Sequence, residues 1–192
     1  MGGGKSIFDN ITADDLILAF FPCIYFENLS MIAFTPKCYN YRKLTFHQTI
    51  DAILERTQKR SYFYGLILKL FAVVKDRGLR MIVENPANQP HYLLFPQNFI
   101  MNPTFIDKNR QMRGDYFKKP TAYWFVNCEP TYGHSYQTPK EKKLVKKAKK
   151  GARAGLCSEE RSLISPDYAR NFICDFIIGK EHEHSIPSLF DL

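Results

Sequence analysis

The chain has 192 residues, of which 45% are hydrophobic and 15% aromatic, so its composition excludes a disordered polypeptide and fits one domain with a full core. The formal net charge of +8 favours an anionic partner such as nucleic acid. The five cysteines include no CxxC pair and no apolar run is long enough to cross a membrane, so we expect no structural metal, no membrane partner and a cytoplasmic location.

The first half of the chain has the pattern of a strand, a long loop, a long helix and a second strand. Residues 15–21 form a continuous apolar run, which is typical of a buried strand. Residues 24–44 have no clear period and predict a loop. Apolar residues at helical spacing predict a helix over 45–77, with a possible break at the polar residues 57–60. A second apolar strand follows at 79–83.

This order of elements predicts that the two strands are parallel. A strand, a crossover helix and a second strand in one sheet form a right-handed unit, whose strands end at the same edge. Cys23 follows the first strand and Glu84 follows the second. Because ligands of open α/β sheets bind at the carboxyl ends of the strands, we expect Cys23 and Glu84 to be neighbours in a site.

The second half predicts short strands, a basic segment and one helix. Phe105-Ile106 and residues 121–127 are rich in strand-forming side chains, and we expect Trp124 to lie in the core. Ser165, Pro166 and Asp167 have the pattern of a helix start, and the apolar stripe of this helix is expected at Ala169, Phe172, Ile173, Phe176 and Ile177. We expect four parts: a catalytic domain at 1–138, a basic linker or small insertion at 139–160, a terminal helix at 161–180 and a tail at 181–192.

Cys23 and Glu84 are the candidates for chemistry. A thiolate at a strand end is a nucleophile when backbone N–H groups or cations stabilise it. The alternative is that Cys23 is a buried structural thiol and Glu84 a carboxylate that caps neighbouring N–H groups. Cys38, Cys128, Cys157 and Cys174 are interpreted as inert.

The motifs around these two residues resemble those of a known family. FPC after one strand and ENP after the next resemble the two catalytic motifs of DNA cytosine-5 methyltransferases, in particular phage and restriction–modification versions that carry ENP. Arg110-Gln111-Met112-Arg113 resembles the Gln-x-Arg-x-Arg motif of that family. The resemblance spans roughly residues 15–178. It implies a three-layer α/β sheet of the Rossmann-like, S-adenosylmethionine-dependent methyltransferase type, partial at its amino end.

The resemblance also implies a reaction. The Cys23 thiolate would add to carbon 6 of cytosine while Glu84 donates a proton or hydrogen bond to ring nitrogen 3. Carbon 5 would then accept a methyl group from S-adenosylmethionine, and elimination would free the cysteine. The base must first be flipped out of DNA, and the loop at 24–44 corresponds to the family's mobile loop that closes over DNA.

Further residues receive roles from the resemblance. Pro22, Asn85 and Pro86 would shape the substrate-binding turns that hold the catalytic pair. Arg113 and Arg110 would contact the carbonyl oxygen of the base or the catalytic pair. An enzyme that methylates an exocyclic amine would need an Asp or Asn at the position of Phe20, so adenine methylation is disfavoured.

Three features depart from the family pattern. The Phe-x-Gly-x-Gly turn that binds the cofactor is absent, so the cofactor-binding residues are unknown and a separate amino-terminal methyltransferase half is a possible partner. Asp115 stands where the family has the last arginine of its motif. Only about 40 residues separate Thr121 from Arg161, which is little for a domain that recognises a DNA sequence.

The basic segment has two interpretations. Its lysines would bind DNA phosphates, or they would form a solvated surface. The candidates for contacts to the DNA backbone are Lys142, Lys143, Lys146, Lys147, Lys149 and Lys150.

The sequence therefore predicts a DNA cytosine-5 methyltransferase-like protein that is inactive alone. The alternatives are a non-catalytic DNA-binding remnant and one subunit of a split methyltransferase.

Overall fold

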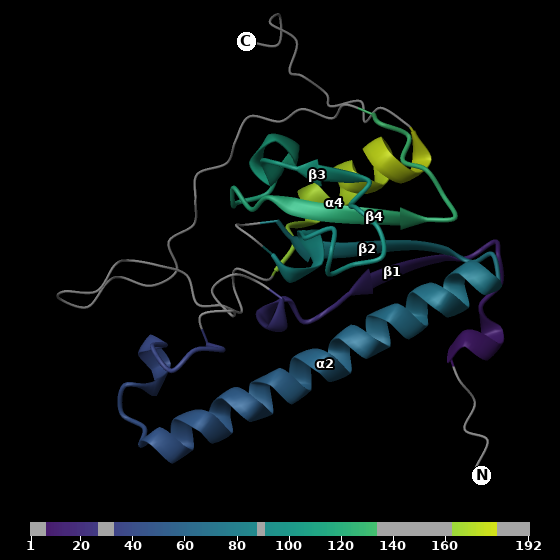
Figure 1. Cartoon of the computed structure of the whole chain (residues 1–192). Coiled ribbons are helices and arrows are strands. Elements are labelled where there is room, and N and C mark those ends of the chain that lie inside the picture. Colours follow the sequence, from purple (N-terminus) through teal and green to yellow (C-terminus); the bar gives the residue numbers. More distant parts are fainter. Residues whose placement is uncertain (1–6, 27–32, 88–90, 134–162, 180–192) are drawn as a thin grey trace, which may run out of the picture. The chain divides into compact units, whose positions relative to one another are not determined.

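The computed structural model describes residues 7–26, 33–87, 91–133 and 163–179 (Figure 1). The chain divides into two compact units, which we describe separately. The first comprises Met1–Asp107 and Pro120–Glu129, and the second comprises Lys108–Lys119 and Pro130–Leu192. The predicted boundaries near residues 138, 160 and 180, the basic segment, Cys157 and the tail lie outside the described residues.

The first unit is built on a mixed four-stranded sheet with the strand order β1-β2-β4-β3. β1 and β2 are parallel, whereas β4 is antiparallel to both β2 and β3. The predicted parallel crossover is therefore confirmed, and the fold is of the mixed α/β type. The strands are β1 (Leu16–Phe20), β2 (Arg80–Pro86), β3 (Phe105–Asp107) and β4 (Thr121–Val126).

The second strand is longer than the sequence predicts. We expected it to end at Val83, but β2 continues through Pro86, and Glu84 pairs with Phe20 on one side and Tyr123 on the other. The prediction was wrong because it followed side-chain polarity. The backbone ladder continues wherever a neighbouring strand supplies partners, and here both β1 and β4 do so.

Helix α2 (Phe46–Asp76) connects the parallel strands and has no break at 57–60. Thr57 donates its hydroxyl to the carbonyl of Ile53 at 2.8 Å, and Lys59 pairs with Glu55 one turn earlier at 2.5 Å. Gln, Lys and Arg are good helix formers, so a polar patch indicates an exposed helix face rather than an interruption. The helix ends before Gly78, whose φ of +63° is the left-handed conformation typical of a helix terminus.

The core lies between α2 and one face of the sheet, and Figure 1 shows α2 running alongside the strands. Ile67, Phe71 and Val74 of α2 belong to one buried cluster with Met81 and Trp124 of the sheet. Trp124 is fully buried, as predicted, and its Nε1 donates to the carbonyl of Met101 at 3.1 Å. The buried cluster therefore joins α2 to β2 and β4.

In the second unit, the start of the last helix is as predicted. Ser165 caps α4 (Pro166–Ile173) by accepting from the N–H of Tyr168, and a π-helical turn, η6 (Cys174–Ile178), continues it to Gly179. The predicted apolar stripe was partly wrong, because Ile173 is exposed and Asn171 and Asp175 are buried instead. These polar side chains pack against polar groups of the same unit.

The cap of α2 gives a stability prediction. Thr45 accepts from the N–H of Gln48, and the Gln48 side chain accepts from the N–H of Thr45. Replacing Thr45 by Ala removes one half of this capping box and should lower the free energy of unfolding by about 1 kcal/mol. Urea denaturation of the variant measures the loss. Thr45→Ser keeps the hydroxyl and is expected to match the wild type, and an equal loss in both variants would contradict the prediction.

Candidate catalytic site

Cys23 and Glu84 belong to neighbouring parts of the first unit: Cys23 follows β1, and Glu84 lies in the carboxyl-terminal half of the adjacent parallel strand β2. Glu84 faces Phe20, the last residue of β1, and Cys23 follows Phe20 by three positions. Pro22 has a φ of −60° and directs the chain out of the strand, so that Cys23 begins the 3-10 turn η2 (Cys23–Tyr25). Cys23 is a half-buried thiol, and Glu84 is also partly exposed. The register therefore brings a thiol and a carboxylate to the carboxyl-terminal parts of two adjacent strands.

A buried hydrogen-bonded chain ties the second motif to the first. The Asn85 side chain donates through Nδ2 to the carbonyl oxygen of Phe21 at 3.4 Å. His91 Nε2 lies 2.8 Å from Asn85 Oδ1, and His91 Nδ1 accepts from the N–H of Leu93 at 3.3 Å. Since Nδ1 accepts, the neutral ring carries its proton on Nε2 and donates to Asn85. Both Asn85 and His91 are fully buried.

Sequence reasoning gave Asn85 a role in shaping the turns but missed His91. His91 lies seven residues after Glu84, in the loop that follows β2, and no sequence motif marks it. The adjacent Pro90 gives only a weak signal, because an X-Pro step restricts the backbone of the residue before the proline rather than that of His91. The partner of His91 could not be deduced from that signal.

His91 should make the stability of the protein depend on pH. Burial of the ring lowers its pKa from 6.5 to about 4. Because the unfolded chain binds this proton more tightly, the free energy of unfolding should fall by about 3 kcal/mol as the pH drops from 6.5 to 4. Urea denaturation at several pH values measures this. His91→Gln cannot take up the proton and should lack this part of the decline, whereas equal slopes would contradict the prediction.

Two arginines of α2 hold the segment that follows Cys23. Arg56 donates through Nη2 to the carbonyl of Ile24 at 2.7 Å, and the Arg60 guanidinium lies 3.9 Å from the centre of the Phe34 ring. The Tyr25 ring stacks on Phe63 of the same helix at 5.1 Å. Arg60 belongs to the polar patch at which the sequence suggested a break. Arg60 is the member of that patch that contacts the loop, whereas Thr57, Gln58 and Lys59 are exposed on the helix surface.

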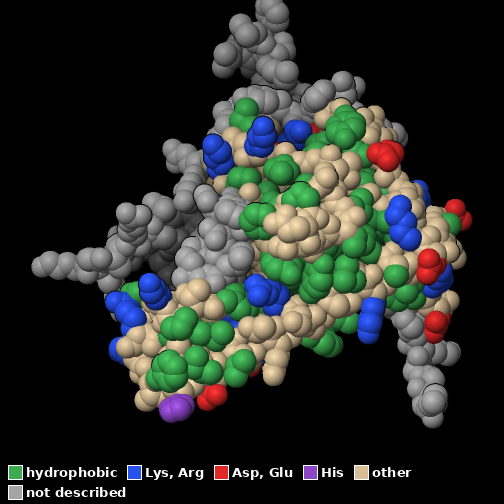
Figure 2. Space-filling model, viewed as in Figure 1, with side chains coloured by type: hydrophobic (Ala, Val, Ile, Leu, Met, Phe, Trp, Pro, Cys, Tyr) green, Lys and Arg blue, Asp and Glu red, His purple; other side chains and the backbone are tan. Residues whose placement is uncertain are grey.

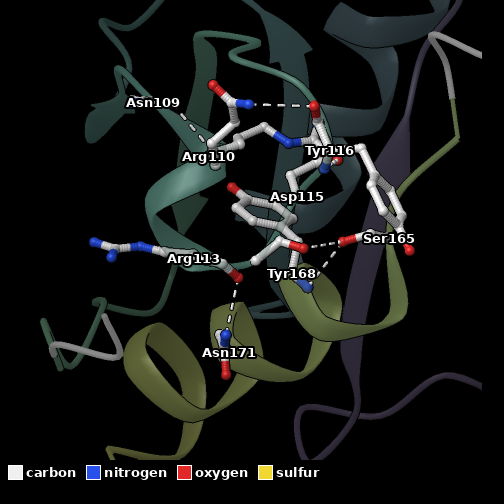
Figure 3. A network of polar contacts seen from close by, with 10 residues as sticks. Asn109, Arg110, Arg113, Asp115, Tyr116, Ser165, Tyr168 and Asn171 are labelled. Carbon is white, nitrogen blue, oxygen red and sulfur yellow. Dashed lines mark hydrogen bonds and ion pairs between the residues drawn. The ribbon is translucent and has the colours of Figure 1, made fainter. Parts of the chain in front are cut away.

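Arg110 and Arg113 belong to the second unit (Figure 3). Arg110 forms an ion pair with Asp115, and each side chain is only 1% exposed. The Arg110 guanidinium also lies 4.2 Å from the centre of the Tyr168 ring. Asp115, which departs from the family's arginine motif, is therefore the counter-ion of Arg110. The guanidinium of Arg110 faces protein groups rather than solvent.

The other arginine is more accessible. Arg113 keeps 20% of its side chain exposed, and its Nη1 lies 3.6 Å from a carboxylate oxygen of Asp175. Asn171 donates to the carbonyl of Arg113 at 2.9 Å, and Ser165 donates to the carbonyl of Gly114 at 2.8 Å. α4 and its cap thus hold the carboxyl end of the turn η5 (Arg110–Arg113). Contacts of Arg110 or Arg113 with a substrate stay predictions.

An exposed aromatic and basic surface lies where α2 begins, and sequence reasoning did not single it out. Figure 2 shows hydrophobic side chains beside Lys and Arg at this end of the first unit. Tyr39 and Phe46 are 73% and 72% exposed. The guanidinium of Arg42 lies 3.1 Å from the centre of the Tyr39 ring, and Lys37 and Lys43 are also exposed. Exposed rings next to cations suit bases and phosphates.

The described residues do not include the glycine turn with which the family that the motifs resemble binds S-adenosylmethionine. The family's cofactor turn places glycines directly after a strand. The described glycines instead lie within or after helices and turns, or, in the case of Gly133, close to the backbone of Asp175. Within the same residues, no three His, Cys, Asp or Glu side chains are grouped so that they could bind a metal ion. None of the helices within the described residues is both long enough and apolar enough to cross a membrane.

No protein-family model, curated protein or solved structure matches the chain.

Proposed function

We propose that the chain carries the base-activating half of a DNA cytosine-5 methyltransferase-like enzyme, with Cys23 as nucleophile and Glu84 as acid. The observation that carries the proposal is the tie between the two motifs. FPC and ENP meet at one sheet edge, and Asn85 of the second motif bonds the carbonyl of Phe21 in the first. The mixed α/β sheet is compatible with part of a three-layer methyltransferase-like fold, and we propose that fold together with the function.

The two side chains supply complementary chemistry. The Cys23 thiolate forms a bond to carbon 6 of cytosine, and the electron pair of the 5,6 double bond moves into the ring toward nitrogen 3. Glu84 supplies a proton or hydrogen bond to that nitrogen. Carbon 5 thereby becomes nucleophilic and takes a proton from water. Loss of a proton from carbon 5 and release of the thiolate then restore the base.

DNA is the partner that the charge and surface of the chain support. The net charge of +8 attracts phosphates. The exposed rings of Tyr39 and Phe46 lie among Lys37, Arg42 and Lys43, a combination that accommodates an unstacked strand. A cytosine must leave the duplex before a thiol can reach carbon 6.

We assign the cofactor to another part of the enzyme. The absence of the family's glycine turn from the described residues supports this assignment, in which methyl transfer requires an amino-terminal half, either on the same protein or on a partner chain. The chain would then be one subunit of a split methyltransferase, or the carboxyl-terminal part of a whole one.

The test uses a readout that needs no cofactor. Reversible addition of Cys23 exchanges the hydrogen on carbon 5 of cytosine with solvent, so DNA that is tritiated at this position should release tritium. We expect release with the wild type and none above background with Cys23→Ser. DNA binding by both proteins should be measured in parallel. If the wild type binds DNA and releases no more tritium than Cys23→Ser, the proposal is wrong.

That negative result would favour a non-catalytic DNA-binding remnant. The aromatic and basic surface supports this second candidate as strongly as the first, because such a surface can bind DNA whether or not Cys23 reacts. A remnant would bind DNA equally well with Cys23→Ser and would never exchange the hydrogen of carbon 5.

A further inference from the structure

We propose that His91 is a positioning residue that fixes the Cys23 turn through Asn85. The inference rests on the proposed function, because the geometry of the turn matters only if Cys23 reacts. His91 donates from Nε2 to Asn85 Oδ1, and Asn85 donates to the carbonyl of Phe21, two residues before the thiol. The hydrogen bond that reaches Phe21 is therefore oriented by the imidazole.

The loop that holds His91 contacts the turn on both sides of Cys23. Before the thiol, the contact runs through Asn85 to the carbonyl of Phe21. After the thiol, the N–H of Tyr92 donates to the carbonyl of Phe26 at 2.8 Å, and the Phe26 ring lies 6.2 Å from the ring of His91. Residues 91 and 92 therefore hold both ends of the segment 21–26.

Each ring nitrogen of His91 has its own role, which separates this histidine from a simple filler. Nδ1 accepts from Leu93 and serves the local turn, while Nε2 donates to Asn85 and serves the Cys23 segment. An amide side chain cannot replace both nitrogens. The amide nitrogen of Gln reaches as far as Nε2 and keeps the donor to Asn85, whereas the shorter Asn keeps an acceptor for Leu93 and loses the bond to Asn85.

The experiment compares His91→Gln with His91→Asn in the full chain. Iodoacetamide labels the thiols, and mass spectrometry of peptides follows each cysteine by itself. Cys128 is the internal reference, because it is half-buried in the same unit and bonds carbonyls of β2 and β4 instead of the Cys23 turn. A general loss of stability would speed the labelling of both cysteines.

We expect His91→Asn to label Cys23 about fivefold faster than the wild type, because one tether of the turn is lost, with Cys128 unchanged. His91→Gln should label both cysteines at the wild-type rates. Wild-type labelling of Cys23 in both variants would overturn the inference. So would equal acceleration of Cys23 and Cys128, or equal acceleration of Cys23 in both variants.

The labelling result and the tritium-release result can fail separately. Selective labelling of Cys23 in His91→Asn, together with no tritium release from the wild type, would keep the positioning role and refute the proposed reaction. Tritium release from the wild type that is unchanged in His91→Asn would support the reaction and refute the positioning role.

Discussion

Replacing Cys23 by Ser is expected to abolish exchange of the cytosine carbon-5 hydrogen and, with the cofactor half supplied, methyl transfer. A serine hydroxyl at neutral pH is almost wholly protonated and adds poorly to carbon 6, so we expect a loss of about a thousandfold or more. Glu84→Gln keeps a hydrogen-bond donor but cannot deliver a proton and should lose about a hundredfold or more. Tritium release and single-turnover methylation measure both variants.

Cys128→Ser is the matched control for these substitutions. Cys128 is a half-buried thiol of the same unit, and burial raises its pKa, which disfavours the reactive thiolate. Its replacement should leave both rates at the wild-type level. Circular dichroism should show that all three variants stay folded. Near-full activity of Cys23→Ser or Glu84→Gln would remove that residue from the mechanism.

Breaking the buried ion pair of the second unit should destabilise that unit strongly. Arg110→Met or Asp115→Asn leaves a buried charge without its counter-ion, which costs about 3–5 kcal/mol. The double substitution Arg110→Met with Asp115→Leu removes both charges and should cost less than either single variant. Hydrogen exchange of the α4 amides measures the local loss. The fluorescence of Trp124, the one tryptophan of the chain, reports on the first unit instead.

An exposed ion pair on α4 serves as the control. Arg170 and Asp167 are 3.7 Å apart, and more than half of the Arg170 side chain is in solvent. Arg170→Met should change the stability by less than about 0.5 kcal/mol, because water screens surface pairs. If the double variant at Arg110 and Asp115 were as unstable as the single variants, loss of packing rather than an uncompensated charge would be the cause.

Local sequence signals predicted several features of the fold well. The apolar run of β1, the burial of Trp124 and the cap at Ser165 depend on hydrophobicity or on residues nearby in the sequence. They can therefore be predicted from one sequence. The parallel pairing of β1 and β2 followed from the order strand, helix, strand, because a helix between two strands is the usual connection of parallel neighbours in a sheet.

Other features depended on partners that lie far away in sequence. Polarity suggested an end to β2 at Val83 and a break in α2 near Arg60, but neighbouring strands and the loop after Cys23 gave these polar residues partners. The last helix shows the same dependence on distant partners. Asp175 is buried because it lies beside Arg113 of η5, whereas Ile173 is exposed.

For the candidate site, the sequence by itself determined the two motifs and the parallel pairing of β1 and β2, which brings Glu84 opposite Phe20, three residues before Cys23. Only the tertiary structure decided that Asn85 bonds Phe21, that His91 orients Asn85 and that Asp115 neutralises Arg110. The physical reason is that each of these partners is selected by burial. A polar group that loses water must find a hydrogen bond or counter-charge in whatever segment the fold brings beside it.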